Sequence, residues 1–133
     1  FANVYGPRQN SKGEGGVVAV FTDAMLSGRR PTIYGSGRQT RDFVFVADAV
    51  EANVLALHAG KTGVFNIGTG KETSVRELFV KIRRNTGFRK NALSAPARPG
   101  DLKRSCLNAS KARRELGWTP ATLLEEGVRH IIP

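Results

Sequence analysis

The sequence predicts a mixed α/β fold in which short strands alternate with helices. Apolar residues recur with helical spacing in several segments, and short runs rich in β-branched and aromatic residues lie between them. Glycines stand at the ends of many of these segments. The 133 residues contain no internal repeat or linker and suffice for one hydrophobic core, so we expect a single domain.

The first expected elements are a strand and an amphipathic helix. Residues 1–5 read as the end of a strand, which a Gly-Pro turn signal stops. After a polar loop over residues 10–16, apolar side chains recur at positions i, i+3, i+4, i+7 and i+8 from Val17 to Met25. This spacing predicts a helix, and Gly28 is placed to end it.

Two β-rich runs, at residues 32–34 and 41–46, flank a glycine turn and predict two strands. Asp48 follows as the expected N-cap of a helix over residues 49–58, since a short carboxylate accepts well from the free N–H groups of a first turn. Three apolar residues share one face of this helix: Val50, Val54 and Leu57.

The rest of the chain predicts one more strand and three helices. Residues 64–67 read as a buried strand. Ser74 and Glu77 have the spacing of a capping box at the start of a helix that Gly87 closes. Residues 92–101 read as a proline-bearing loop. The last expected elements are short helices over residues 109–116 and 122–131.

The charge balance favours an anionic partner. The formal net charge is +10, from 21 Lys and Arg against 11 Asp and Glu, which suits either a nucleic acid or a diphosphate ligand. The basic residues occur as scattered pairs without interleaved aromatic residues, which argues against a nucleic-acid surface.

The single cysteine limits the redox and metal chemistry. Cys106 has no partner for a disulfide within the chain, which favours a cytoplasmic origin, and we expect its side chain to be buried. With two histidines beside it, a zinc site is not expected, and no apolar run has the length of a membrane span.

Two glycine patterns resemble the start of a dinucleotide-binding fingerprint. Gly35-Ser36-Gly37 and Gly68-Thr69-Gly70 both lack the third glycine of G-x-G-x-x-G, because Thr40 and Thr73 stand in its place. We therefore interpret them as turn glycines and predict no cofactor-binding residues.

Three motifs occur in a fixed order: N-V-Y-G-P-R-Q at residues 3–9, Y-G-S-G-R-Q-T-R-D-F-V-F-V-A-D at residues 34–48, and R-P-G-D at residues 98–101. Together they resemble the carboxyl-terminal half of the NAD-dependent nucleotide-sugar epimerases, in the extended short-chain dehydrogenase/reductase family, and most of all its UDP-glucose 4-epimerase group. The resemblance covers nearly the whole chain. It implies a carboxyl-terminal substrate-binding domain, residues 1–133, of a longer protein whose Rossmann cofactor domain is absent here.

The resemblance also implies where a UDP-sugar would bind. Arg41 and Arg98 match arginines that contact the diphosphate, and guanidinium groups suit that role by charge and geometry. Asn3 matches an asparagine that lies against the same diphosphate. Asp101 matches an aspartate that accepts from the ribose hydroxyls, and Ser105 stands where relatives carry a residue that walls the sugar pocket.

The nucleobase end follows from the same resemblance. Thr32, Ile33 and Tyr34 would lie along the uracil, and Val17 and Val18 near the diphosphate and sugar. No catalytic residue is expected in this chain, because neither of its tyrosines begins the Y-x-x-x-K pair of the family.

The implied activity belongs to the complete protein. It would invert the sugar at C4 through a 4-keto intermediate with NAD, whereas this chain would bind the UDP-sugar, hold no NAD and be inactive alone. The same motifs suit a nucleotide-sugar 4,6-dehydratase or a UDP-glucuronate decarboxylase, and a basic nucleic-acid-binding module is the remaining alternative. Apolar surface that the cofactor domain would cover predicts a homodimer.

Overall fold

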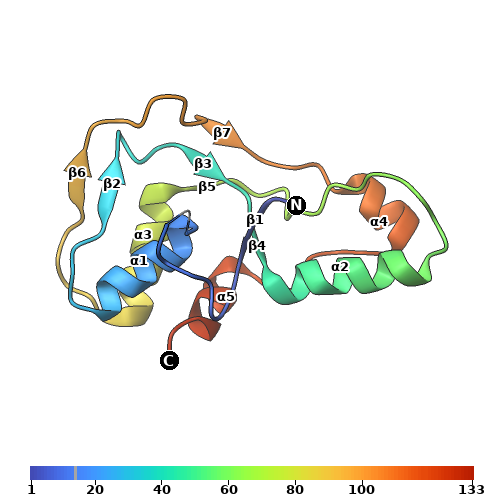
Figure 1. Cartoon of the computed structure of the whole chain (residues 1–133), viewed down its shortest axis with the longest axis horizontal. Helices are drawn as coiled ribbons and strands as arrows, with labels where there is room; N and C mark the ends of the chain where they lie inside the picture. Colours follow the sequence, from blue (N-terminus) through green and yellow to red (C-terminus); the bar gives the residue numbers. More distant parts are fainter. Residues whose placement is uncertain (14) are drawn as a thin grey trace.

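The computed structural model describes residues 1–13 and 15–133, so residue 14 of the expected 10–16 loop lies outside the described part. It has the mixed α/β architecture that the sequence predicts (Figure 1). The elements are, in order, β1 (Asn3–Tyr5), α1 (Val17–Leu26), β2 (Thr32–Tyr34), β3 (Thr40–Arg41), β4 (Phe43–Phe45), α2 (Val46–His58), β5 (Thr73–Ser74), α3 (Val75–Thr86), β6 (Leu93–Ala95), β7 (Arg104–Ser105), α4 (Ser110–Leu116) and α5 (Leu124–His130).

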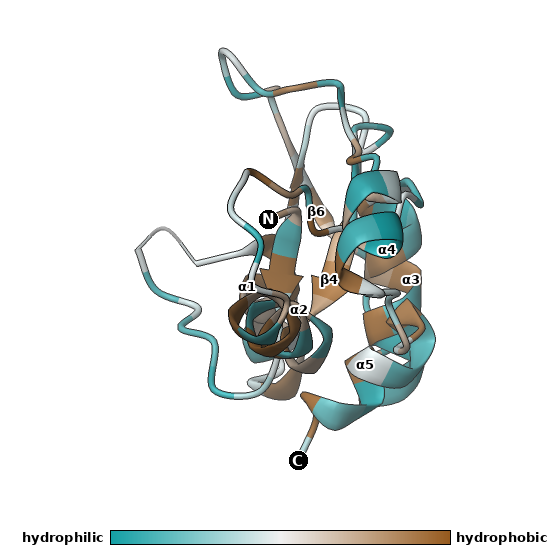
Figure 2. Cartoon of the chain, turned by 90° about the vertical axis from the view of Figure 1, so that its right-hand side faces the viewer, coloured by the Kyte–Doolittle hydropathy of each residue, from teal (hydrophilic) through white to brown (hydrophobic). Residues whose placement is uncertain are grey.

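Three small sheets join segments that are far apart in the sequence. β1 pairs with β4 and β2 with β6, both in parallel, with Tyr5 opposite Phe45 and Tyr34 opposite Ala95. In the third sheet β3 lies between β5, which is antiparallel to it, and β7, which is parallel. Figure 2 shows α1 and α2 on one side of the strands and α3, α4 and α5 on the other. The strands thus lie between two groups of helices.

The main hydrophobic core lies between α1, α3 and α5. Phe21 of α1 meets Phe79 of α3 edge to face, with ring centroids 6.1 Å apart. Leu78, Ile82 and Val128 are wholly buried beside them. The apolar stripe expected from Val17 to Met25 faces this core at Phe21, Ala24 and Met25.

Helix α3 begins and ends as the sequence predicts. The Ser74 hydroxyl accepts from the Glu77 N–H, and the Glu77 carboxylate accepts from the Ser74 N–H, which completes the capping box. These hydrogen bonds from Ser74 lower the pKa of Glu77. Gly87 ends the helix in the left-handed conformation, at φ +69°.

Asp48 does not cap α2, contrary to the expectation. The helix starts at Val46 directly after β4, so Phe45 is the N-cap residue and Asp48 lies buried in the first turn. Its carboxylate accepts from the backbone N–H and the hydroxyl of Thr122, and its carbonyl accepts from the Trp118 indole. Asp48 therefore ties the segment before α5 to α2.

Three further expectations are corrected. Residues 64–67 form no strand: Val64 is 84% exposed, although the Ile67 carbonyl accepts from the Ala2 N–H. The run 41–46 is divided between β3 and β4, because the strands have different partners on either side of Asp42. The loop 92–101 contains β6, which forms since β2 offers a free edge there.

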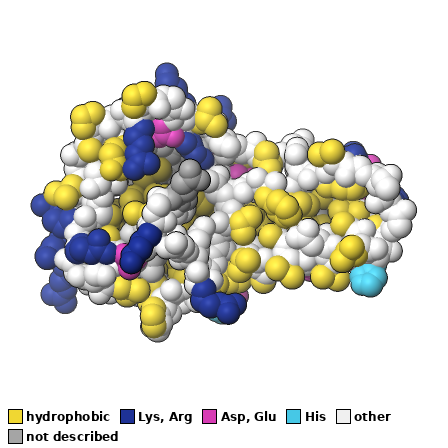
Figure 3. Space-filling view, viewed as in Figure 1, with side chains coloured by type: hydrophobic (Ala, Val, Ile, Leu, Met, Phe, Trp, Pro, Cys, Tyr) yellow, Lys and Arg dark blue, Asp and Glu magenta, His cyan; other side chains and the backbone are white. Residues whose placement is uncertain are grey.

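The apolar residues of α2 share a face, but that face lies on the surface. Val50, Val54 and Leu57 are 55%, 46% and 82% exposed, and Figure 3 shows the hydrophobic side chains gathered on this side of the molecule. The second core cluster, around Trp118 and Ala52, lies on the other face of the helix. This exposed apolar face is a candidate for an interaction surface.

The first testable prediction concerns the buried Asp42. Its carboxylate accepts from the backbone N–H groups of Thr69, Gly70 and Leu107 and from the Thr69 hydroxyl. Asp42→Asn should lower the free energy of unfolding by about 1.5–3 kcal/mol, the range for hydrogen bonds to a charged group. Urea unfolding measures this, with Asp23→Asn as the control, because Asp23 pairs with Arg29 on the surface. Equal losses in the two variants would contradict the role of Asp42.

Glu72 makes the second prediction, which concerns pH. Its carboxylate accepts from the Arg104 guanidinium and the Thr40 hydroxyl, and these contacts, Arg104 first, lower the pKa of Glu72 from 4.5 to about 2. Because the folded-state pKa is the lower one, the stabilisation is complete above pH 4.5 and is lost as the pH falls towards 2.

The measurement compares wild type with Glu72→Gln in urea. The wild type should be the more stable protein at about pH 6, and the difference should shrink at about pH 2 as the carboxylate takes up its proton. Glu51→Gln, an exposed change on α2, is the matched control. A difference that stays constant over this pH range would show that the ion pair between Glu72 and Arg104 does not stabilise the fold.

Candidate functional site

The candidate site is a cavity of about 400 Å³ between α1, β2, β3 and the loop before β7. Figure 3 shows a hollow on this face, with a hydrophobic floor and charged side chains at its rim. Seven of the residues proposed from the sequence line it: Asn3, Val17, Thr32, Tyr34, Arg41, Arg98 and Asp101. These residues come from five separate segments of the chain, and the fold brings them to one place.

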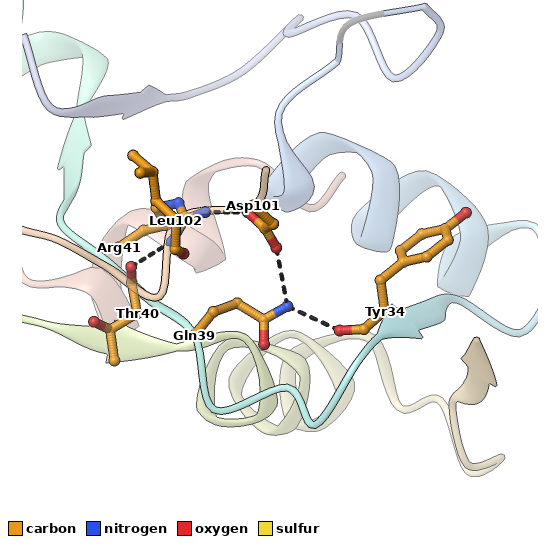
Figure 4. A network of polar contacts seen from close by, with 6 residues as sticks. All are labelled: Tyr34, Gln39, Thr40, Arg41, Asp101 and Leu102. Carbon is orange, nitrogen blue, oxygen red and sulfur yellow. Dashed lines mark hydrogen bonds and ion pairs between the residues drawn. The ribbon is translucent and has the colours of Figure 1, made fainter. Parts of the chain in front are cut away.

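Arg41 is the most firmly held charge in the cavity. Its Nη1 donates to the carbonyls of Thr40 and Leu102, each at 2.7 Å, and its Nη2 pairs with the Asp101 carboxylate. The side chain is 17% exposed, and Figure 4 shows its contacts with Thr40, Leu102 and Asp101. Among the described residues its Nε has no hydrogen-bond partner, so the guanidinium keeps a donor for an anion while its position is fixed.

Gln39 connects the charged pair to β2. Its Nε2 donates to the Tyr34 carbonyl at 2.9 Å and to Asp101 Oδ2 at 3.4 Å, as Figure 4 shows. The amide therefore holds one oxygen of the Asp101 carboxylate, while Arg41 holds the other. Nothing in the sequence singled out Gln39, although it lies two residues before Arg41 and so points to the same side of an extended segment.

Arg98 stacks on Tyr34. The guanidinium carbon lies 3.9 Å from the ring centroid, which is a close cation–π contact. The Asp101 N–H donates to the Arg98 carbonyl at 3.2 Å and forms a turn, so both charged residues of the R-P-G-D motif reach the cavity.

Three of the proposed residues do not line the cavity. Ile33 is buried in the core, because successive side chains of a strand point to opposite faces and Thr32 and Tyr34 take the cavity side. Val18 is also buried in the core, one position round the helix from Val17. Ser105 lies on β7 opposite Arg41 and is partly buried. Their contacts with a ligand remain predictions.

Other residues complete the lining without having been expected from the sequence: Ser11, Gly13, Gly15, Val20, Phe21, Gln39 and Val75. The signal for Val20 and Phe21 was present, since they share the helical stripe of Val17. The apolar members form the floor of the cavity.

The glycines of both incomplete fingerprints lie in turns whose backbone N–H groups are already hydrogen-bonded within the chain. The N–H groups of Thr69 and Gly70 donate to the Asp42 carboxylate at 2.9 and 3.0 Å, and the Gly35 N–H donates to the Ala95 carbonyl at 2.9 Å. A dinucleotide pyrophosphate needs such N–H groups free, so these residues do not fit NAD.

Cys106 is exposed, contrary to the expectation that it is buried. It follows β7 near the surface, where the chain has left the sheet. Desolvation, followed by the nearby Asp42 carboxylate, raises the pKa of the thiol, which disfavours the nucleophilic thiolate. Within residues 1–13 and 15–133 no cluster of His, Cys, Asp and Glu could hold a metal, and none of the helices described has the length and apolar character to cross a membrane.

Comparison with known proteins gives a consistent result. A family model described as GDP-mannose 4,6 dehydratase matches residues 1–131. The chain is 51% identical over 128 residues to the UDP-glucose 4-epimerase of Mycolicibacterium smegmatis, which covers 96% of this chain and 41% of that protein.

Solved structures agree with this match. The UDP-glucose 4-epimerase of Thermotoga maritima with UDP-glucose superimposes with a TM-score of 0.94 at 49% identity, over 96% of this chain and 41% of that one. The Thermus thermophilus UDP-glucose 4-epimerase in complex with NAD gives 0.89 at 40% identity, over 97% and 42%. The chain therefore spans about two fifths of the length of these relatives.

Proposed function

The chain belongs to the NAD-dependent epimerase/dehydratase family of extended short-chain dehydrogenases/reductases, and from this membership we propose that it is the UDP-sugar-binding part of a UDP-glucose 4-epimerase-like enzyme. The observation that supports this most is the meeting of Arg41, Arg98 and Asp101 at one cavity. Residues 1–133 would then form the carboxyl-terminal substrate-binding domain of the parent protein.

In this proposal the cavity binds the nucleotide through its diphosphate, its ribose and its base. The free donors of Arg41 and the guanidinium of Arg98 bind the diphosphate, and Asn3 lies against it. Asp101 accepts from the ribose hydroxyls while it stays paired with Arg41. Tyr34 and the β2 backbone meet the base, and the apolar floor below α1 faces the sugar.

The redox part of the reaction lies outside this chain. NAD supplies hydride exchange at the sugar in the complete enzyme. The residues here do not fit that cofactor, since the backbone N–H groups of their glycine turns already donate hydrogen bonds within the chain. The chain also lacks the Y-x-x-x-K pair, so we expect it to bind substrate without turning it over. Its single cysteine suits the cytoplasmic location that we propose for the parent.

A dehydratase or decarboxylase is the second candidate for the parent. The matching family model carries the description of a GDP-mannose 4,6 dehydratase, which favours this class, whereas 51% identity to an epimerase favours the first. Both candidates use the same nucleotide grip. Assay of the full-length parent with UDP-glucose, for UDP-galactose against a 4-keto-6-deoxy product, separates an epimerase from a dehydratase, and release of CO₂ from UDP-glucuronate identifies a decarboxylase.

The nucleotide grip makes the third prediction. Arg41→Gln and Arg98→Gln should each weaken UDP binding by roughly 1.5–3 kcal/mol, because each removes charge-assisted hydrogen bonds to the diphosphate. Isothermal titration of UDP into the chain measures the effect. Arg89→Gln removes an equal charge from an exposed position beyond α3 and should leave the affinity unchanged. If Arg98→Gln binds UDP as tightly as wild type, the R-P-G-D segment is only a loop.

We also propose that the isolated chain forms a homodimer through the exposed face of α2, and this gives the fourth prediction. The face carries Val50, Val54 and Leu57, and pairing two copies would remove them from water. Light scattering at high micromolar concentration should give a dimer mass for wild type and a monomer mass for Val54→Lys/Leu57→Lys.

The control for this experiment is Leu26→Lys on α1. Leu26 is 48% exposed, close to the exposure of Val54, but lies on another helix, so the variant should remain a dimer. A wild-type chain that scatters as a monomer would refute the proposal.

A further inference from the structure

A second cavity, of about 410 Å³, adjoins the nucleotide cavity on the far side of Gln39 and Asp101. Arg38, Lys103 and Arg104 line it and take no part in the first cavity. Arg98 and Asp101 border both. The two cavities therefore share one wall, and the R-P-G-D segment forms much of it.

The backbone that carries these cations is fixed at both ends. Arg76, in the first turn of α3, donates from its N–H to the Gly37 carbonyl at 3.0 Å and from its Nε to the Ser36 carbonyl at 2.6 Å. Gly37 has φ +71°, and a Cβ there would lie 2.6 Å from the Arg76 side chain, so the turn before Arg38 is tightly enclosed.

The other wall is held by the third sheet. The Thr40 N–H donates to the Lys103 carbonyl at 3.0 Å, and β3 pairs in parallel with β7, with Thr40 opposite Arg104. Lys103 and Arg104 are thus kept beside the turn that carries Arg38. The cations of this cavity meet because of the fold and not because they are neighbours in sequence.

The charge of the second cavity is not balanced from within. Four cationic side chains line it, against the single carboxylate of Asp101, and that carboxylate already pairs with Arg41. Arg104 pairs with Glu72 outside the cavity. Arg38 and Lys103 are exposed side chains, and Arg98 stacks on Tyr34 with its donors directed to its edges. Such a concentration of cations on fixed backbone attracts a small anion.

We propose that this cavity is a second anion site, which binds a phosphate dianion between Arg38, Lys103 and Arg98. Because Arg98 borders both cavities, a bound phosphate competes with the nucleotide for its guanidinium and weakens nucleotide binding. The site itself stands on the charges and geometry described above. The coupling alone rests on the proposed function of the first cavity.

The first experiment tests the site without any nucleotide. Inorganic phosphate is titrated into the chain at constant ionic strength, and binding is followed by isothermal titration. Arg38→Gln/Lys103→Gln should bind phosphate about tenfold more weakly than wild type, since two charge-assisted contacts are lost.

The matched control removes the same two charge types elsewhere. Lys61→Gln/Arg114→Gln changes one exposed lysine and one exposed arginine near α2 and α4, and should bind phosphate like wild type. Wild-type affinity in Arg38→Gln/Lys103→Gln would overturn the proposal. An equal loss in the control would also overturn it, because the net charge alone would then explain phosphate binding.

The second experiment tests the coupling. Wild type should bind UDP more weakly in phosphate than in chloride of equal ionic strength, whereas Arg38→Gln/Lys103→Gln should show a much smaller difference and wild-type UDP affinity in chloride. The same effect of phosphate on UDP binding in both proteins would refute the coupling between the two cavities. If wild type does not bind UDP at all, the proposed function fails, while the phosphate titration still decides the second site.

Discussion

The site depends on one buried carboxylate. Asp42 interrupts the run between β3 and β4 and accepts four hydrogen bonds from two distant segments, at residues 69–70 and at Leu107. A buried carboxylate is stable only when its lone pairs are satisfied in this way. Because Arg41 is its neighbour in the chain, the contacts that fix Asp42 on the inside also fix the backbone from which the Arg41 side chain extends into the cavity. The most buried charge thus sets the position of a nearly buried cation.

Much of the fold follows from local sequence rules. The capping box at Ser74, the left-handed glycine at Gly87 and the apolar stripe of α1 are all as expected, because each is determined within a few residues. Asp48 shows where these rules end. Its type suits an N-cap, but the chain enters α2 directly from β4, and a tertiary contact with Thr122 takes the carboxylate instead.

The site could be predicted in part for a similar reason. Arg41, Arg98 and Asp101 were identified by motifs, and the structure places them together. Gln39 was not identified, because its importance comes from the 2.9 Å contact with the Tyr34 carbonyl and its reach to Asp101, which no motif reveals. Ile33 was proposed from the family resemblance, yet it faces the core, since a three-residue strand gives one side to the cavity and the other to packing. Motifs indicate which segments meet, and the alternation of side chains along a strand decides which of them face the cavity.

The parallel pairing of distant strands constrains how the chain folds. Arg41 meets Leu102 and Asp101 across separations of 61 and 60 residues, and β2 finds β6 over a similar stretch. Closing loops of this length is slow, and parallel strands have no hairpin to start from. The cavity therefore cannot form before segments 60 and 61 residues apart have met. A nascent chain would gain ligand protection only once the R-P-G-D segment had been synthesised.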